Sequence, residues 1–419
     1  MVDIVVVGAG SAGAVIAGRA VTRFGRSVTL VEAGPVHDAA AVPAPIAGPN
    51  FHRALEVPGR TWGATYSSGR GVGGSSSVNA MVGLVEGLDD LTVVDGLPIE
   101  LRRAMPRERG VLSEAFAAAA RSLAVPVGDA LLTRSADGRR CSVNEAYLEP
   151  ARQTGRLDVL GDAVVDRVLF EGTRAVGVRL ADGREVSAGR VVIAAGAVRT
   201  PAVLLRSGVD RPSVGVGLQD HPALTIPVRL RADAVQARDG VLGRRPGEVV
   251  SVTSVGRLDH PDVGGLQLLA ADSIDGDDPT RATLMAVVLQ VESRGRVSLA
   301  STDPLVEPLL EFDPGAHPTD RMALVMAHRA LEALLATPEL AAVVAEAGDA
   351  ALGGAHHASS TCRMGRPDDV AAVVDHECRV LGTESLWVCD ASVFPRAPRT
   401  NPHLPVVLLA ERIAAVVGT

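Results

Sequence analysis

The chain has 419 residues, enough for two domains that share an interface, and 47% of them are hydrophobic, enough for a large buried core. Its net charge of -8 and the absence of any dense basic run argue against nucleic acid or an anionic membrane surface as a partner. The four cysteines, Cys141, Cys362, Cys378 and Cys389, form no C-x-x-C pair, which fits neither a disulfide framework nor a metal cluster and favours a reducing, cytoplasmic setting.

The first predicted strand, Ile4 to Val7, runs directly into the turn G-A-G-S-A-G and then into a helix-permissive segment. Asp3 precedes it and no basic leader is present, so we expect neither a signal peptide nor a membrane span. In a dinucleotide-binding unit the first glycine permits a tight turn, the second admits a pyrophosphate and the third packs the helix on the strand. The turn therefore predicts a dinucleotide site at Gly8, Gly10, Ser11, Ala12 and Gly13.

The second predicted strand, Ser27 to Val31, ends in Glu32 and Ala33. This position, about 20 residues after the glycines, is where a carboxylate binds the two ribose hydroxyls of a dinucleotide. The alternative is a buried strand followed by an unrelated surface glutamate. A Pro/Ala/Gly-rich segment follows from Pro35 to Pro58 and predicts an extended surface loop.

Gly69 to Met81 reads G-R-G-V-G-G-S-S-S-V-N-A-M. So many small residues permit close backbone approach to a ligand, and their N–H groups can form an anion nest. A flexible Gly/Ser linker is the alternative interpretation, although linkers seldom contain an embedded Val, Asn and Met.

This segment resembles the first signature of the glucose–methanol–choline (GMC) flavoprotein oxidoreductases, G-R-x-x-G-G-S-S-x-x-N-x-M. The resemblance implies that the loop wraps the pyrophosphate of FAD and passes close to its isoalloxazine ring. Some members attach FAD covalently to a histidine just before the asparagine, but here Val78 holds that place. We therefore expect noncovalent FAD, with contacts from Gly71, Gly74, Ser75, Asn79 and Met81.

Residues 88–130 depart most from the family, whose members usually carry a longer, aromatic-rich lid here. The segment contains a single aromatic residue, Phe116, and apolar spacing predicts a helix from Val111 to Leu123. We predict an unusually open entrance that admits a bulky substrate or a protein electron acceptor.

Alternating residues bounded by turns predict a β-meander of three strands, at 163–170, 175–180 and 184–188, before a separate buried strand at 190–195. The segment G-A-V-R-T-P-A-V-L-L-R-S-G, Gly196 to Gly208, resembles the second GMC signature and predicts another strand–glycine–helix junction at the cofactor. By the same resemblance, Val165 matches a valine that contacts adenine, and Gly196 lies at the cofactor.

Gly215 to His221 resembles the family's crossing into the substrate domain, which would make Asp220 and His221 structural. Five strand-like runs then follow without predicted helices between them, and they indicate an antiparallel sheet. An amphipathic helix is predicted from Thr319 to Leu335. The five runs are 225–230, 249–256, 265–272, 284–292 and 296–300.

Two carboxyl-terminal segments resemble the family's catalytic motifs. Residues 356–365, H-H-A-S-S-T-C-R-M-G, place His357 on the catalytic histidine. In an extended chain His356 would point the opposite way, so we expect only one of the two to face the flavin. Residues 386–412 place His403 on the second catalytic position and Asp390 beside the cofactor. The resemblance adds Ala391, His403 and Leu404 to the predicted FAD contacts.

These histidines suit alcohol oxidation, because removal of a hydride from a carbinol carbon also requires loss of the hydroxyl proton. A neutral imidazole, whose pKa is about 6.5, accepts that proton near neutral pH. We assign His357 as the general base and His403 as the residue that orients the substrate oxygen. Paired core histidines are the alternative, and a metal site at His356, His357 and Cys362 is disfavoured by the poor ligand geometry of adjacent histidines, so we expect no metal.

The resemblance implies an α/β FAD-binding Rossmann-like domain, of the GMC and p-hydroxybenzoate hydroxylase-like type, plus a smaller α+β substrate domain with an antiparallel sheet. We expect the FAD-binding domain at 1–87, 131–218 and 340–419, a shortened lid at 88–130 and the substrate domain at 219–339. The expected activity is FAD-dependent oxidation of a small-molecule alcohol. A non-redox relative resembling hydroxynitrile lyases and an FAD-free binding protein are the alternatives. Oxygen, a quinone or a redox carrier such as mycofactocin, whose associated dehydrogenases the chain also resembles, would accept the electrons.

Overall fold

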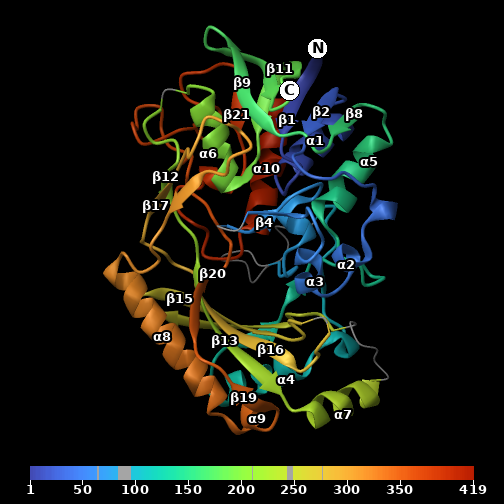
Figure 1. The fold of residues 1–419 in the computed structure, drawn as a ribbon, viewed down its shortest axis with the longest axis vertical. Coiled ribbons are helices and arrows are strands. Elements are labelled where there is room, and N and C mark those ends of the chain that lie inside the picture. The colour runs from blue at the N-terminus through green and yellow to red at the C-terminus, as the bar shows by residue number, and fades with distance from the viewer. Residues whose placement is uncertain (64–65, 84–95, 210, 243–248, 276) are drawn as a thin grey trace.

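The computed structural model describes residues 1–63, 66–83, 96–209, 211–242, 249–275 and 277–419 (Figure 1). Two large sheets lie one above the other, and the chain crosses between them several times. The upper unit holds a mostly parallel sheet, and the lower unit holds an antiparallel sheet. The predicted combination of a Rossmann-like part with an antiparallel substrate part is confirmed.

The upper sheet has the strand order β8-β2-β1-β11-β10-β9, and β21 pairs with β11. Its central strands are runs of buried Val, Ile and Leu, as expected for strands that are covered on both faces. Its bounds are β1 Val2–Val7, β2 Val28–Val31, β8 Leu157–Leu160, β9 Val165–Glu171, β10 Arg174–Leu180, β11 Glu185–Ile193 and β21 Leu386–Val388.

Strand β11 corrects the predicted division at Gly189 into a meander strand and a separate buried strand. It is one continuous strand that changes partner along its length: Ser187 pairs with Gly177 in an antiparallel ladder, and Val191 pairs with Val5 in a parallel one. No turn is needed at Gly189, because the meander and the parallel sheet are parts of one sheet.

Helices cover the upper sheet, and the amino-terminal helix α1 packs on the carboxyl-terminal helix α10. Arg19 of α1 makes a two-pronged ion pair with Glu411 of α10, at 2.6 and 2.9 Å, and the Tyr147 hydroxyl donates to the same carboxylate at 2.8 Å. Both ends of the chain are thereby joined behind the sheet. The helices are α1 Gly13–Thr22, α2 Ala44–Ala47, α3 Phe51–Leu55, α5 Glu149–Arg152, α6 Gly196–Arg206 and α10 His403–Gly418.

The lower sheet has the order β19-β13-β16-β15-β14-β6, with β20 also paired to β13. Alternating residues face opposite sides. On β15, Leu266, Leu268 and Ala270 pack under helices, whereas Leu269 and Ala271 pack towards the upper unit. The strands are β6 Val127–Asp129, β13 Pro222–Leu230, β14 Ser254–His260, β15 Gly264–Ala271, β16 Arg281–Val288, β19 Val344–Ala347 and β20 Ala351–Gly354. The helices are α4 Val111–Ser122, α7 Ala232–Leu242, α8 Pro318–Leu335 and α9 Pro338–Ala341.

The smaller ladders connect the two units. They are a three-stranded sheet of β12 Val216–Leu218, β17 Gly295–Ser298 and β18 Leu309–Glu311, and two-stranded ladders of β3 Thr61–Trp62 with β4 Ser68–Gly69 and of β5 Arg102–Arg103 with β7 Leu131–Leu132. None of the helices in these described ranges is both long and apolar enough to cross a membrane.

Several predictions for the lower unit need correction. Helix α7 interrupts the expected succession of strands, and its sequence gives little warning because Val235 is its one buried residue. The run 296–300 contributes its first three residues to β17 in the small sheet, and the run 249–256 contributes only its last three residues to β14. Residues 344–354 pair with β13, although everything after 340 was expected in the FAD-binding part.

The helix predicted at 111–123 is present as α4, but it packs against the lower sheet with Phe116 fully buried in that core. Of the segment expected to form the shortened lid, residues 88–95 lie outside the described residues. The open entrance therefore stays a prediction.

Candidate active site

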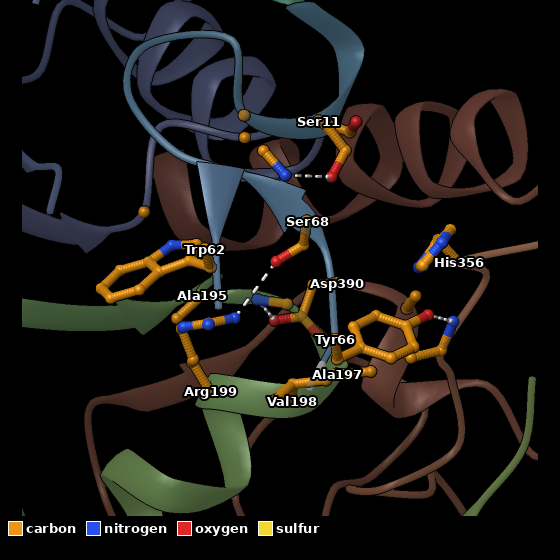
Figure 2. Close-up of a pocket in the computed structure, with 18 of the residues that line it drawn as sticks. Ser11, Trp62, Tyr66, Ser68, Ala195, Ala197, Val198, Arg199, His356 and Asp390 are labelled. Carbon is orange, nitrogen blue, oxygen red and sulfur yellow. Dashed lines mark hydrogen bonds between the residues drawn. The ribbon is translucent and has the colours of Figure 1, made fainter. Parts of the chain in front are cut away.

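A cavity of about 470 Å³ lies between the upper and lower units (Figure 2). Its walls come from the turn after β1, the loop at 66–82, the start of α6, the two histidine segments and the inner face of the lower sheet. Figure 2 shows Trp62 beside Arg199 in one part of the cavity and Tyr66 near His356 in another. Segments far apart in the sequence thus converge on one site.

The Glu32 carboxylate joins three of these loops. Its Oε2 accepts the N–H of Ala9 at 2.8 Å, and its Oε1 accepts those of Gly34 and Gly71 at 2.9 Å each. Glu32 is buried and lines the cavity. The predicted ribose-binding carboxylate therefore also holds the glycine turn, the end of β2 and the 69–81 loop in register.

The glycines of these loops meet backbone to backbone. A Cβ on Gly74, whose φ is +50°, would lie 2.6 Å from the Gly10 Cα, so no larger residue fits there. A Cβ on Gly8 would lie 2.5 Å from the Ala194 oxygen, and one on Gly13 would lie 1.9 Å from the Gly8 oxygen. The roles predicted for Gly8 and Gly13, a tight turn and helix packing, match this geometry.

Most predicted cofactor contacts line the cavity, but three do not. Gly13 packs behind the turn, Gly71 donates its N–H to Glu32, and the Leu404 side chain is buried beside Gly83. These three shape the wall from behind. The predicted residues that line it are Gly8, Gly10, Ser11, Ala12, Glu32, Ala33, Gly74, Ser75, Asn79, Met81, Val165, Gly196, Asp390, Ala391 and His403.

Asp390 fastens the second glycine junction. Its Oδ2 accepts the N–H of Gly196 at 2.9 Å and the hydroxyl of Thr200 at 2.5 Å, and its Oδ1 accepts the N–H of Ser392 at 2.8 Å. Burial raises the pKa of Asp390, while these bonds favour its charged form. Asp390 therefore holds the backbone of Gly196 and Ser392 beside the cavity.

His403 is the first residue of α10 and reaches the glycine turn. Its Nδ1 lies 2.9 Å from the Ser11 hydroxyl, whereas its Nε2 is buried without a hydrogen-bond partner in the described structure. Burial, aided by the charge of Arg140, lowers the pKa of His403 to about 4. His403 is therefore neutral at pH 7 and has one ring nitrogen available to a ligand.

His357 lies on the opposite segment and contacts a second histidine. Its Nδ1 is 2.9 Å from Nδ1 of His221, and the two rings meet edge to face. Asp220 accepts the backbone N–H groups of both, at 2.7 Å from His357 and 2.8 Å from His221. Burial and the two neighbouring histidines hold the pKa of His357 well below its usual value.

The chain is not extended at His356, which has a φ of +60°. The left-handed conformation breaks the expected alternation, and both His356 and His357 line the cavity. Which of the two faces the flavin stays a prediction. The His356 ring packs against Tyr66 at 5.3 Å between ring centres.

Several site residues were missed in the sequence. Trp62 and Tyr66 line the cavity, and Arg199 lies over the Trp62 ring at 4.0 Å while donating to the Ser68 hydroxyl at 3.1 Å. Scarcity was the signal for Trp62 and Tyr66, because the chain has only two Trp and two Tyr, whereas Arg199 had no such signal. His221 was assigned a structural role, and its contact with His357 had no local signal because 136 positions separate them.

The residues present fit a dinucleotide flavin. The glycine contact of Gly10 with Gly74 leaves backbone exposed on the cavity side, as a pyrophosphate requires. Two buried polar atoms, Nε2 of His403 and Oδ1 of Asn401, lack partners among the described residues and line the same cavity. Such atoms in a native site need a hydrogen-bond partner, which a bound ligand or an ordered water supplies.

Two GMC oxidoreductase family models match the chain, at residues 103–223 and 291–410. The chain belongs to the GMC oxidoreductase family. This membership confirms the predicted FAD cofactor and the oxidoreductase class.

Two relatives of this GMC oxidoreductase are identical to it at about a third or fewer of the aligned residues. It is 32% identical over 308 residues to an uncharacterised GMC-type oxidoreductase of Rhodococcus erythropolis, covering 67% of this chain and spanning 60% of that relative. It is 29% identical over 529 aligned residues to the 5-(hydroxymethyl)furfural oxidase of a Methylovorus species, covering 100% of this chain and 98% of the relative.

The fold agrees with solved structures. The crystal structure of pyridoxine 4-oxidase from Mesorbium loti superposes with a TM-score of 0.81 and 23% sequence identity, covering 99% of this chain and 98% of that one. At this identity the likeness establishes the shared fold.

The contact between Gly10 and Gly74 predicts that a side chain at position 74 weakens FAD binding. Gly74→Ala places a methyl group against the Gly10 backbone, so we expect FAD affinity to fall by about 10-fold or more. Gly172→Ala is the matched control, because Gly172 also has a positive φ but nothing within 4 Å of its Cβ position. FAD absorbance per protein after gel filtration measures the effect. Equal FAD content in the two variants would contradict it.

The buried histidines predict acid sensitivity. Burial lowers the pKa of His37, His52, His221 and His403 to about 4, so unfolded histidines bind protons at a higher pH than folded ones. Stability therefore falls as the pH drops from about 6.5 to 4. Asp220, whose folded pKa is about 6, and Asp390, whose pKa burial raises, act oppositely. The histidines outnumber them, because the pKa values of His356 and His357 are lowered as well.

Urea midpoints at pH 7 and pH 4.5 test this expectation, with a lower midpoint expected at pH 4.5. His52→Gln should shrink the difference, whereas replacement of the exposed His376 by Gln should leave it unchanged. A midpoint that does not change between the two pH values would contradict the prediction.

Proposed function

We propose that this GMC oxidoreductase oxidises the CH–OH group of an alcohol to a carbonyl, with His357 and His403 as its catalytic residues. The observation that carries the proposal is their placement: two uncharged imidazoles, from segments on either side of Asp390, line one cavity with the dinucleotide cradle. The name of the relative that oxidises 5-(hydroxymethyl)furfural supports a hydroxymethyl-type substrate.

FAD, when bound, supplies a two-electron acceptor for hydride. The protein must take up the hydroxyl proton, and a neutral imidazole does this without prior deprotonation. His357 is the proposed general base. His403 would hydrogen-bond the substrate oxygen through Nε2, because its Nδ1 is already engaged by Ser11. Gly10, Gly74, Glu32 and the first turn of α10 would hold the cofactor.

His221 is the proposed positioning residue for His357. Of two facing Nδ1 atoms, one must carry the proton and the other must accept it. We assign the shared proton to His357, so that Nδ1 of His221 accepts it and Nε2 of His357 keeps a lone pair for the substrate proton. Nε2 of His221 is buried and has no hydrogen-bond partner among the described residues.

A non-redox reaction would use the same histidines as acid and base without changing the flavin. Anaerobic addition of a panel of primary and secondary alcohols distinguishes the two, because only alcohol oxidation bleaches the visible flavin absorbance. Stopped-flow reoxidation with oxygen, quinones and carrier proteins then identifies the electron acceptor.

Removal of the base should slow the chemical step. We expect His357→Ala to lower the rate of flavin reduction by about 100-fold or more while FAD stays bound, since general base catalysis contributes about that much. His356→Ala is the matched control, because His356 lines the same cavity without contacting His221, and its loss should stay within about 10-fold. Anaerobic stopped-flow absorbance measures both. A His357→Ala enzyme that is reduced at the wild-type rate would remove this residue from the mechanism.

Replacement of His221 tests the tautomer. Gln retains an acceptor for the His357 Nδ1–H and Phe does not, so His221→Phe should slow flavin reduction on the order of 10-fold and His221→Gln should restore most of the rate. Imidazole ¹⁵N NMR gives an independent measurement: wild-type His357 should show an unprotonated Nε2 at pH 7. A proton on that nitrogen, or identical behaviour of the Phe and Gln variants, would overturn the positioning role.

The lowered pKa of His357 also predicts how the rate of flavin reduction depends on pH. Because His357 stays neutral well below pH 6.5, the reduction rate should not fall as the pH is lowered from 9 to 6.5. A decline with an apparent pKa at or above 6.5 would contradict this assignment.

A further inference from the structure

Gln267 is a buried amide that has no partner in the folded chain. It lies in the middle of β15 with only 2% of its surface exposed, and it lines the cavity. Neither its Nε2 nor its Oε1 has a hydrogen-bond partner among the residues that the structure describes. Leaving both polar atoms of an amide unpaired in a protein interior is costly, so a native structure retains such a group for a reason.

The cavity wall beside Gln267 is apolar. On the inner face of the lower sheet the cavity is lined by Gln267 and Leu269 of β15 and by Met285 and Val287 of β16. In the sheet register Gln267 lies opposite Val287 on one side and opposite Arg257 of β14 on the other, and Arg257 pairs with Asp259 outside the cavity lining. The sheet residues that line the cavity beside Gln267 are apolar, as strand alternation places them on the buried face. Within the cavity lining the amide is thus the one hydrogen-bonding side chain that the described part of this sheet contributes.

Charge is absent from this wall. None of the described residues that the lower sheet contributes to the cavity is charged, and the ionised groups that line it come from other segments. Those groups are Glu32, Arg199, Arg206, Glu307 and Asp390. The sheet wall therefore offers hydrophobic contact and one neutral amide, which suits an uncharged ligand and gives a cation no carboxylate to pair with.

We propose that Gln267 determines substrate specificity by binding a second, neutral hydrogen-bonding group of the alcohol, remote from the carbon that is oxidised. The substrate would be an uncharged alcohol with an apolar body and a distal hydroxyl or carbonyl. An amide both donates and accepts, so a hydroxyl satisfies it in either role. The inference rests on the proposed function, because it assigns the substrate class of the same cavity.

The experiment compares matched alcohols on the holoenzyme. The probes are α,ω-diols of four to eight carbons, each paired with the monoalcohol of equal length. Dissociation constants come from saturation of the flavin reduction rate, or from perturbation of the oxidised flavin spectrum if no reduction occurs. Binding is thus measured even if the proposed oxidation fails, so the two failures are distinguishable.

Gln267→Leu is the test variant. Gln290→Leu is its matched control, because it is the same substitution at a residue that does not line this cavity. The measured quantity is the ratio of the dissociation constants of the monoalcohol and the diol of equal length. For at least one chain length, this ratio should be about 10-fold smaller in Gln267→Leu than in the wild type, because the variant loses one buried hydrogen bond to a neutral group. The preference should not change in Gln290→Leu.

The inference would be overturned if Gln267→Leu kept the wild-type preference for the diol over the monoalcohol. It would also be overturned if neither alcohol series showed saturable binding to the wild-type enzyme. Tighter binding of choline than of every diol would overturn the uncharged substrate class. An ordered water that holds the amide in a substrate complex would also overturn it, because the amide would then serve the folded chain.

Discussion

The site depends on one carboxylate that accepts three backbone N–H groups. Glu32 gathers the turn after β1, the end of β2 and the 69–81 loop around two oxygens. Charge-assisted bonds of this kind are stronger than neutral ones, and burial keeps water from competing for them. The contact of Gly10 with Gly74 is possible only because these loops are held in this register. A residue expected to touch the ribose is thus first a structural clamp.

In the half of the site that holds the proposed catalytic histidines, two further carboxylates accept backbone N–H groups. Asp220 holds the backbones of His221 and His357, while Asp390 holds the start of α6. Each of the two buried aspartates joins segments from distant parts of the chain, so side-chain geometry in the cavity is set by backbone anchors behind it. The imidazoles themselves remain uncharged because their surroundings are desolvated.

Sequence motifs predicted the parts of the site that are local. The glycine turn, Glu32 and the second glycine junction were found because spacing along a single segment specifies them. Contacts between segments could not be predicted from the sequence. The His221–His357 contact requires two loops that Asp220 holds together. Gln267 could not be told from any other polar strand residue without knowing which face of the sheet it lies on. In the fold, α7 was missed because it buries a single residue and so has no apolar periodicity.

The change of partners along β11 has a consequence for biosynthesis. The centre of the upper sheet requires Val5 to pair with Val191 and β11 to pair with Leu386, so it is complete only after segments far apart in the chain have been synthesised. Assembly dominated by such distant pairings is slow, and strand edges that wait unpaired invite association with other chains. Productive maturation of this enzyme should therefore favour slow translation, low temperature or assistance from chaperones during expression.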